Sequence, residues 1–301
     1  MQNARKKRLV VIGRNGQVAR SLVERADPRA DLEVVTIGRP ELDLSDPDSI
    51  EDAVRSASPD AVLAAAAYTQ VDRAENEVEL ARFVNGRAPG ILAEITDRIG
   101  VPIVHLSTDY VFDGTKPTGY VETDETAPLN VYGLTKREGE MGVRGATRNH
   151  AILRTAWLYS PYGRNFVKTM LTIARDKPAI SVVDDQIGTP TSTLDLADAI
   201  LVVTRNLIES DSLAYRGTFH ATASGYTSWA GFARRIFECS AASGGPNARV
   251  EPIPTELFPT PAIRPSKSML DCSKLFQAHG VRLPPWQASV CGVVDRILSN
   301  T

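Results

Sequence analysis

The sequence predicts an α/β fold of the Rossmann type, a doubly wound parallel sheet, followed by a smaller mixed α/β lobe in the C-terminal half. Short apolar runs alternate with helical patterns through the first half of the chain, as in parallel sheets covered on both faces by helices. A turn with two glycines, Gly13-Arg-Asn-Gly16, follows the first apolar run. After Arg154 the alternation gives way to a mixed pattern rich in proline.

Five apolar runs are the expected strands of the sheet, because each is short and lacks the alternation of a half-exposed strand. They cover residues 9–12, 32–37, 61–65, 101–106 and 151–154. Helical patterns separate them at residues 17–25, 46–56, 78–99 and 130–143. Ser45 is the expected N-cap of the second of these helices, because a serine hydroxyl accepts hydrogen bonds from free amides at a helix start.

The second half of the chain predicts a smaller lobe with a blurred boundary. Its expected helices cover residues 166–175 and 194–206, and its expected short strands cover residues 180–183 and 217–221. Dense prolines between residues 252 and 265 indicate surface loops. We expect residues 1–155 to form the Rossmann domain, to which the chain returns around 180–208, and residues 156–301 to form mainly the second lobe.

Size and composition exclude several classes of protein. The chain has 301 residues, of which 43% are hydrophobic and 23% charged, and its net charge of −2 argues against a nucleic-acid-binding surface. The most apolar run, residues 61–68, is less than half of the ~20 residues that cross a bilayer. The apolar run behind the basic residues 5–8 is too short for a signal peptide. A cytoplasmic protein without a membrane partner is expected.

The cysteines predict thiols rather than cross-links. The chain has three, Cys239, Cys272 and Cys291, and they form no C-x-x-C pair. An odd, scattered set argues against a disulfide framework or a zinc site. We expect small buried thiols in a reducing compartment.

The glycine turn has the context of a dinucleotide-binding loop, because it lies between a strand and a helix. Gly13 permits the tight turn, and Gly16 lets the backbone approach a pyrophosphate at the helix N-terminus, next to Asn15 and Gln17. Ala19 stands where helix and strand pack closely. The pattern G-x-x-G-x-x-A is looser than G-x-G-x-x-G, so a purely structural turn is the alternative.

The end of the second strand favours NADPH over NADH. NAD-selective sites often carry an acidic residue there, whereas this chain has Arg39 and no carboxylate. Arg39, together with Arg14 of the glycine turn, could meet a 2′-phosphate. The alternative is that both arginines are solvated, and NADH remains a second cofactor candidate. Asp43 and Leu44 follow, where they could hold the adenine edge.

Tyr132 and Lys136 are candidate catalytic residues. They are one helical turn apart in Asn130-Val-Tyr-Gly-Leu-Thr-Lys136, so a helix places both on one face. A nearby ammonium favours the phenolate, and we therefore expect Lys136 to lower the pKa of Tyr132. The spacing alone is a weak signal, because Y-x-x-x-K often arises by chance.

Taken together, these motifs resemble the dTDP-4-dehydrorhamnose reductase family of extended short-chain dehydrogenase/reductases. The resemblance runs nearly end to end. It rests chiefly on Gly13-Arg-Asn-Gly-Gln-Val18, Ala65-Ala-Ala-Tyr-Thr69, Ser107-Thr-Asp-Tyr-Val-Phe-Asp-Gly114, Asn130-Val-Tyr-Gly-Leu-Thr-Lys136, Arg154-Thr-Ala-Trp157, Asp185-Gln186-x-Gly188-x-Pro190-Thr191 and Arg264-Pro265. The block that begins at Ser107 and the Tyr132/Lys136 block are specific in combination.

The resemblance implies an NADP-binding domain, a sugar-nucleotide lobe and a dTDP-sugar substrate. Tyr132 would be the proton donor, Lys136 its partner and holder of the nicotinamide ribose, and Thr108 the third catalytic hydroxyl. Matching cofactor-lining positions are Gly16, Gln17, Val18, Asp43, Leu44, Ala67, Tyr68, Thr69 and Leu106. Matching substrate positions are Thr108, Asp109 and Trp157, and Arg264 could meet a sugar-nucleotide pyrophosphate or form a surface ion pair.

The implied reaction is NADPH-dependent reduction of a 4-keto sugar, and the implied role is in dTDP-rhamnose biosynthesis. Some members of the family dimerise through a metal held by glutamates, but Leu194 stands at one of those positions. Neither Mg²⁺ nor metal-linked dimerisation is therefore expected, and a homodimer of another kind stays open. Three alternatives remain: a non-catalytic NADP-binding subunit similar to the regulatory β-subunit of methionine adenosyltransferase, an epimerase that retains its nicotinamide, and a reductase of another nucleotide 4-keto sugar.

Overall fold

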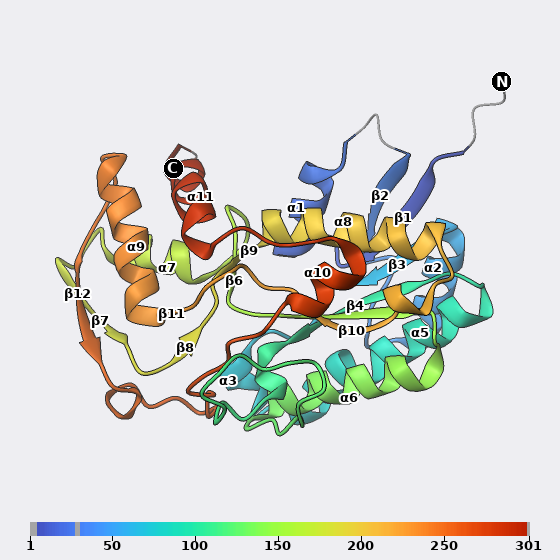
Figure 1. The fold of residues 1–301 in the computed structure, drawn as a ribbon, viewed down its shortest axis with the longest axis horizontal. Helices are drawn as coiled ribbons and strands as arrows, with labels where there is room; N and C mark the ends of the chain where they lie inside the picture. The colour runs from blue at the N-terminus through green and yellow to red at the C-terminus, as the bar shows by residue number, and fades with distance from the viewer. Residues whose placement is uncertain (1–4, 28–30, 300–301) are drawn as a thin grey trace.

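A six-stranded parallel sheet with helices on both faces forms the larger part of the computed structural model (Figure 1). The structure describes residues 5–27 and 31–299. The strands of this sheet are β1 (Lys7–Ile12), β2 (Leu32–Ile37), β3 (Ala61–Ala64), β4 (Ile103–Thr108), β5 (His150–Thr155) and β10 (Gly217–His220). Their spatial order is β10-β5-β4-β3-β1-β2. The predicted doubly wound parallel sheet is confirmed.

The strand register aligns the carboxyl ends of the central strands. Ile12 of β1 faces Ala64 of β3, and Thr108 of β4 faces Thr155 of β5. Every residue of β4 and β5 is buried, because helices cover both faces of the sheet. The chain leaves β1 toward β2 on one side and returns to β3 on the other, which creates a switch point between β1 and β3. Ligands of open α/β sheets bind in the crevice at such a point.

Helices from both halves of the chain cover the sheet (Figure 1). α1 (Gln17–Arg25) and α8 (Thr193–Glu209) lie on one face, whereas α2 (Pro47–Ala57), α5 (Ala88–Arg98) and α6 (Val131–Ala146) lie on the other. Shorter segments precede α5, namely α3 (Val71–Ala74), α4 (Val78–Arg82) and the π-helical turn η1 (Phe83–Arg87). The expected helical pattern over 78–99 is therefore present, with a π-helical turn between two α-helices.

The second lobe has a core of its own. Its helices are α7 (Phe166–Ile173), α9 (Trp229–Ala242) and α11 (Trp286–Ser299), and they surround the parallel pair β7 (Ala179–Val183) and β12 (Arg249–Ile253). Two short strand pairs lie between this lobe and the sheet. One pairs β6 (Leu158–Tyr159) with β9 (Thr191–Ser192), and the other pairs β8 (Ile187–Gly188) with β11 (Thr227–Ser228). α10 (Ser273–His279) packs beside β10. The 3₁₀ turns are η2 (Asp109–Val111), η3 (Leu213–Tyr215) and η4 (Thr255–Leu257).

The chain returns to the sheet through α8 and β10. The α1–α8 contact contains a buried hydrogen bond between the Ser21 and Thr193 hydroxyls (2.6 Å) and a two-bond ion pair from Arg25 to Asp198 (2.7 Å each). β10 adds an edge strand beside β5, whereas β7 stays in the second lobe. The position of the domain boundary stays a prediction.

Two sequence-based expectations are wrong. Ser45 is not the N-cap of α2, because the helix begins at Pro47 and the Ser45 hydroxyl donates to Asp43 (2.8 Å). Cys239 and Cys291 are not free thiols but form a disulfide between α9 and α11, and Cys272 alone is free. The packing of the two helices brings cysteines 52 residues apart to a Cα–Cα distance of 4.9 Å. The spacing of the cysteines in the sequence does not predict the contact between Cys239 and Cys291.

Candidate active site

Most of the predicted site residues line one cleft at the carboxyl edge of the sheet. The cleft has a volume of about 770 Å³. The predicted residues in its wall are Gly13, Asn15, Gly16, Gln17, Val18, Ala67, Thr69, Leu106, Thr108, Asp109, Tyr132, Lys136 and Trp157. The structure thus brings the glycine turn, the end of β4 and the start of α6 together across the switch point.

The glycine turn offers free backbone amides to an anion. Gly13 has φ +124°, a conformation that favours glycine, and its N–H donates to the Ile37 carbonyl (2.8 Å). α1 begins at Gln17 with no side-chain cap and no acidic residue in its first turn. A Cβ added to Gly16 would meet nothing within 4 Å. The open space and the helix N-terminus fit a dinucleotide pyrophosphate.

The arginines expected at a 2′-phosphate are paired with carboxylates in this structure. Arg39 binds Asp43 (2.8 and 3.1 Å), and Arg14 binds Glu41 (2.8 Å). The Arg39 hydrogen bonds, followed by those from Ser45, lower the pKa of Asp43 to about 2. Arg14 lines the cleft, whereas Arg39, Asp43 and the buried Leu44 do not. Arg39 is therefore outside the cleft wall, and its role at a 2′-phosphate stays a prediction.

Asn85 fixes the backbone that follows β3. Its buried side-chain amide accepts from the Tyr68 N–H (2.8 Å) and donates to the Tyr68 carbonyl (3.1 Å) and to Thr135 of α6 (3.2 Å). The Tyr68 side chain lies outside the cleft wall, and its hydroxyl donates to Glu77 (2.6 Å). Asn85 thereby holds the segment around Tyr68 against the helix that carries Tyr132.

Tyr132 lies in the first turn of α6, next to the end of β4. Asn130 caps the helix by accepting from the Gly133 N–H (2.8 Å). A Cβ at Gly133 would lie 2.2 Å from the Tyr110 carbonyl oxygen, so glycine is needed for this close approach. Burial raises the pKa of Tyr132 to about 12, although a hydrogen bond with Thr108 acts in the opposite direction. The two hydroxyls are therefore adjacent, and Tyr132 is a protonated donor at neutral pH.

Lys136 does not act on Tyr132 as expected. Its ammonium donates to the Leu106 carbonyl (2.6 Å), and burial lowers the pKa of Lys136 to about 8 against the opposing charge of Glu140. Lys136 is not among the groups that shift the pKa of Tyr132. The pKa of Tyr132 is raised by desolvation of the phenol, and the expected lowering by Lys136 is not found in this structure.

A buried ion pair supports the floor of the site. Arg154 of β5 donates two hydrogen bonds to Glu140 of α6 (2.8 Å each), and Ser107 adds a third (2.6 Å). Burial opposes ionisation of Glu140, but the bonds from Arg154 outweigh it and lower the pKa of this carboxyl. Glu140 lies one turn beyond Lys136, so the pair fixes α6 against β4 and β5 below the catalytic residues.

Asp109 belongs to the cleft wall, and one of its carboxyl oxygens is buried without a hydrogen-bond partner. The side chain is 2% exposed, one oxygen accepts from Thr108 (3.1 Å), and the other makes no hydrogen bond among the residues that the structure describes. Burial raises the pKa of Asp109 to about 7, although the nearby Ser268 and Thr108 hydroxyls act in the opposite direction. A buried oxygen of this kind fits a ligand hydroxyl, because an unpaired polar group is costly.

A second cavity of about 240 Å³ adjoins the cleft across two stacked tryptophans. Trp157 lines the cleft and stacks on Trp229, with ring centroids 3.5 Å apart, and Trp229 lines the second cavity. Phe166, Phe258 and Arg264 lie in the same wall. Arg264 is therefore not in the cleft. It is ion-paired with Asp72 (2.7 Å), which belongs to the first half of the chain.

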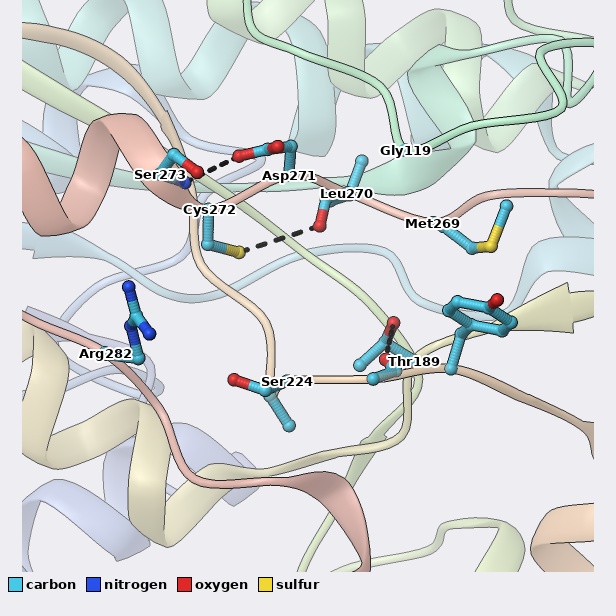
Figure 2. Close-up of a pocket in the computed structure, with 12 residues that line it drawn as sticks. Gly119, Thr189, Ser224, Met269, Leu270, Asp271, Cys272, Ser273 and Arg282 are labelled. Atoms are coloured by element: carbon cyan, nitrogen blue, oxygen red, sulfur yellow. Dashed lines mark hydrogen bonds between the residues drawn. The ribbon is translucent and has the colours of Figure 1, made fainter.

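A third cavity, of about 390 Å³, contains none of the predicted site residues. Figure 2 shows its wall, in which Thr189 and Ser224 face the segment that carries Asp271 and Cys272. The polar groups of that segment bond to one another, since Asp271 accepts from the Ser273 amide (2.7 Å) and the Cys272 thiol contacts the Leu270 carbonyl (3.9 Å). Nothing in this wall extends the chemistry of the cleft.

Metal ligands and membrane spans are not found in the described parts of the chain. Within residues 5–27 and 31–299 no three His, Cys, Asp or Glu side chains gather closely enough to hold a metal ion. No helix in those ranges is long and apolar enough to cross a membrane.

Sequence reasoning missed several cleft residues. They are Ala65, Ala66, Ser107, Thr155, Ala156, Leu158, Gly163 and Arg164. Thr155 could have been found, because it ends β5 directly opposite Thr108. Gly163 and Arg164 gave no local signal, since they reach the cleft through the path of the chain after β6.

Comparison with known proteins gives matches along nearly the whole chain. A family model described as the RmlD substrate binding domain matches residues 7–299. A dTDP-4-dehydrorhamnose reductase of Sinorhizobium fredii is 45% identical over 291 residues, 97% of this chain and 98% of that protein.

Solved structures agree. A dTDP-4-dehydrorhamnose reductase from Clostridium acetobutylicum has a TM-score of 0.89 at 36% identity and covers 98% of this chain and 100% of its own. One from Bacillus anthracis, in complex with NADP, has a TM-score of 0.87 at 34% identity with the same coverage.

Proposed function

Because the chain belongs to the dTDP-4-dehydrorhamnose reductase family, we propose that it reduces the C4 ketone of dTDP-4-dehydro-L-rhamnose to dTDP-L-rhamnose with NADPH. The observation that carries this proposal is the meeting of Thr108, Tyr132 and Lys136 in one cleft with an uncapped helix N-terminus. A non-catalytic subunit that only binds NADP would not need Thr108, Tyr132 and Lys136 together.

The cofactor would lie along the glycine turn. Gly13, Gly16 and the first amides of α1 would hold its pyrophosphate, and Arg14 or Arg39 would exchange a carboxylate partner for the 2′-phosphate. Lys136 would bind the nicotinamide ribose, and the position of its ammonium beside Leu106 in the cleft wall supports this role. When bound, NADPH supplies the hydride that reduces the ketone carbon.

Tyr132 and Thr108 would act on the ketone oxygen. Negative charge develops on that oxygen as the carbon is reduced, and two adjacent hydroxyl donors stabilise it. Tyr132 transfers its proton, and its high pKa keeps that proton available across the physiological range. Asp109 would accept from a sugar hydroxyl through its free oxygen.

The second cavity would receive the nucleotide. Its apolar wall includes Trp229 and Phe258, which offer faces for a pyrimidine base, and Arg264 supplies a cation for the sugar-nucleotide phosphates. The stacked Trp157 and Trp229 connect this cavity with the cleft, so the sugar would lie over Trp157. Three further points stay predictions. They are that residues 156–301 serve mainly in substrate binding, that the protein is cytoplasmic, and that it forms a homodimer.

The test is reduction of the 4-keto sugar by a Tyr132→Phe variant. NADPH oxidation should slow by about 100-fold or more, because general acid catalysis contributes roughly 10²–10⁴-fold. NADPH affinity should be unchanged. Tyr226→Phe is the control, since Tyr226 is 65% exposed and lies in the wall of the third cavity.

If the Tyr132→Phe variant turns over near the parent rate, the assignment of Tyr132 as the proton donor is wrong. Other nucleotide 4-keto sugars should be assayed beside the dTDP substrate, and greater activity on one of them would redirect the substrate assignment. Absorbance of the purified protein in the reduced-cofactor band would indicate an epimerase that retains its nicotinamide.

A further inference from the structure

A segment of the second lobe crosses the start of the glycine-turn helix. The Ser160 hydroxyl donates to the Gln17 side-chain oxygen (2.7 Å), and the Asn165 amide donates to the same oxygen (3.0 Å). Gln17 is the first residue of α1. Both ends of residues 160–165 are therefore tied to the helix N-terminus at which the cofactor pyrophosphate is proposed to bind.

The middle of this segment lies in the cleft wall. Gly163 and Arg164 line the cleft together with Gly13 and Gly16. Gly163 has φ +60°, and a Cβ there would lie 3.3 Å from the Gln17 side chain. Glycine at 163 thus allows the segment to pass close to α1, and this passage brings Arg164 to the cleft.

Charge distinguishes Arg164 from the other cations of the cleft. The lining residues include three, Arg14, Lys136 and Arg164. Arg14 is paired with Glu41, and Lys136 donates to the Leu106 carbonyl. Arg164 is exposed, and among residues 5–27 and 31–299 it has neither an ion pair nor a hydrogen bond. Its guanidinium is the cation of the cleft that remains available for an anionic ligand.

We propose that Arg164 is a diphosphate-binding residue, contributed by the second lobe, that binds the cofactor pyrophosphate opposite the N-terminus of α1. This inference rests on the proposed use of NADPH. Helix amides and the α1 dipole would bind the pyrophosphate from the Rossmann domain, and a planar guanidinium would bind it from the other side. Because NADPH and NADH share this pyrophosphate, Arg164 serves both equally.

The test is a set of nicotinamide-fluorescence titrations of Arg164→Gln with NADPH and with NADH. Because the variant removes a charged hydrogen-bond donor to the pyrophosphate, its affinities for NADPH and NADH should both fall by about 10- to 100-fold. Arg164→Lys should recover part of the loss. Arg175→Gln is the matched control, since Arg175 is an exposed arginine just beyond α7 in the same lobe. Arg14→Gln should weaken NADPH more than NADH.

Separate titrations with dTDP distinguish the two sources of diphosphate in the reaction. Arg164→Gln should bind dTDP like the parent, and its unfolding midpoint should match the parent because the side chain has no protein partner. Parent-like affinity for both nicotinamides overturns the inference, and so does a loss confined to NADPH or to dTDP. A parent protein that binds neither nicotinamide would instead overturn the proposed function.

Discussion

Burial sets the protonation of the catalytic side chains. Tyr132, Lys136 and Asp109 line the cleft, and in each case desolvation is the largest cause of the pKa shift. Desolvation disfavours the charged form, so it raises the pKa of acids and lowers that of the lysine. Desolvation therefore separates the pKa values of the two residues, so that Tyr132 titrates at a higher pH than Lys136.

A pH dependence follows for Lys136. Its ammonium is present below its pKa of about 8 and is lost as the pH rises through that value. Since the charged form would bind the cofactor ribose, kcat/KM should fall above about pH 8, well before Tyr132 titrates. The falling limb should disappear in a Lys136→Arg variant that remains folded, because a guanidinium stays charged. A parent profile that is flat to pH 9.5 would contradict the assignment of this limb.

Strand ends could be predicted from the sequence, whereas side-chain partners could not. The apolar runs 101–106 and 151–154 predicted two neighbouring strands, and in the structure these strands end side by side at Thr108 and Thr155. Arg39 was expected at a phosphate or in solvent, and Arg264 at a phosphate or in an ion pair; in the structure they pair with Asp43 and Asp72 respectively. Which anion an arginine binds depends on neighbours that are distant in the chain or absent without ligand, and no local pattern contains that information.

At the scale of elements, α6 is the piece on which the site depends most. It carries Tyr132 and Lys136, and its glycines permit close approach to neighbouring backbone. A Cβ at Gly139 would lie 2.1 Å from the Asn85 carbonyl oxygen, whereas a Cβ at Gly145 would meet nothing within 4 Å. Gly139 therefore sets the spacing between α6 and η1, and through Asn85 the position of the segment around Tyr68.

Alanine substitutions at these two glycines should have opposite effects on stability. Gly145→Ala should raise the free energy of unfolding by about 0.5–1 kcal/mol, because alanine has the higher helix propensity. Gly139→Ala should lower it by about 1–3 kcal/mol, the usual cost of forcing extra atoms into a packed contact. Urea unfolding measures both. Equal midpoints for the two variants would show that α6 is not held at this distance from η1.

The disulfide between α9 and α11 joins the two longest helices of the second lobe. It closes a loop of 52 residues, for which the chain-entropy account gives a stabilisation of about 4 kcal/mol. Cys239 is 2% exposed, so folded protein should resist mild reductants.

Thiol titration after denaturation tests this cross-link. Without reductant one thiol, that of Cys272, should react, and after reduction all three cysteines should react. The reduced protein should unfold at lower urea concentration than the oxidised protein. Three reactive thiols before reduction would mean that the cysteines are free, as their scattered spacing had suggested.

At the scale of the whole molecule, the path of the chain joins the two lobes. After β5 the chain forms α7 and β7 of the second lobe, yet it returns through α8 and β10 to complete the sheet and its covering layer (Figure 1). Residues after 155 therefore supply one edge strand and one helix of the Rossmann layers. The sequence predicted a return around residues 180–208, a range that includes most of α8, but it did not assign β10 to the edge of the sheet, because a short strand has no local signal for its partner.

This interweaving predicts a single unfolding transition. All three tryptophans, Trp157, Trp229 and Trp286, lie beyond residue 155, so their fluorescence reports on the second lobe. Far-UV circular dichroism reports on helices of both lobes. If α8 couples the lobes through its contacts with α1, the two signals should give the same urea midpoint, which is the test of two-state behaviour. NADPH at 100 times its dissociation constant should raise the free energy of unfolding by about 2.7 kcal/mol. Both urea midpoints should therefore rise together. A fluorescence transition that precedes the circular dichroism transition, or that does not move when NADPH is added, would show that the second lobe unfolds independently of the cofactor-binding sheet.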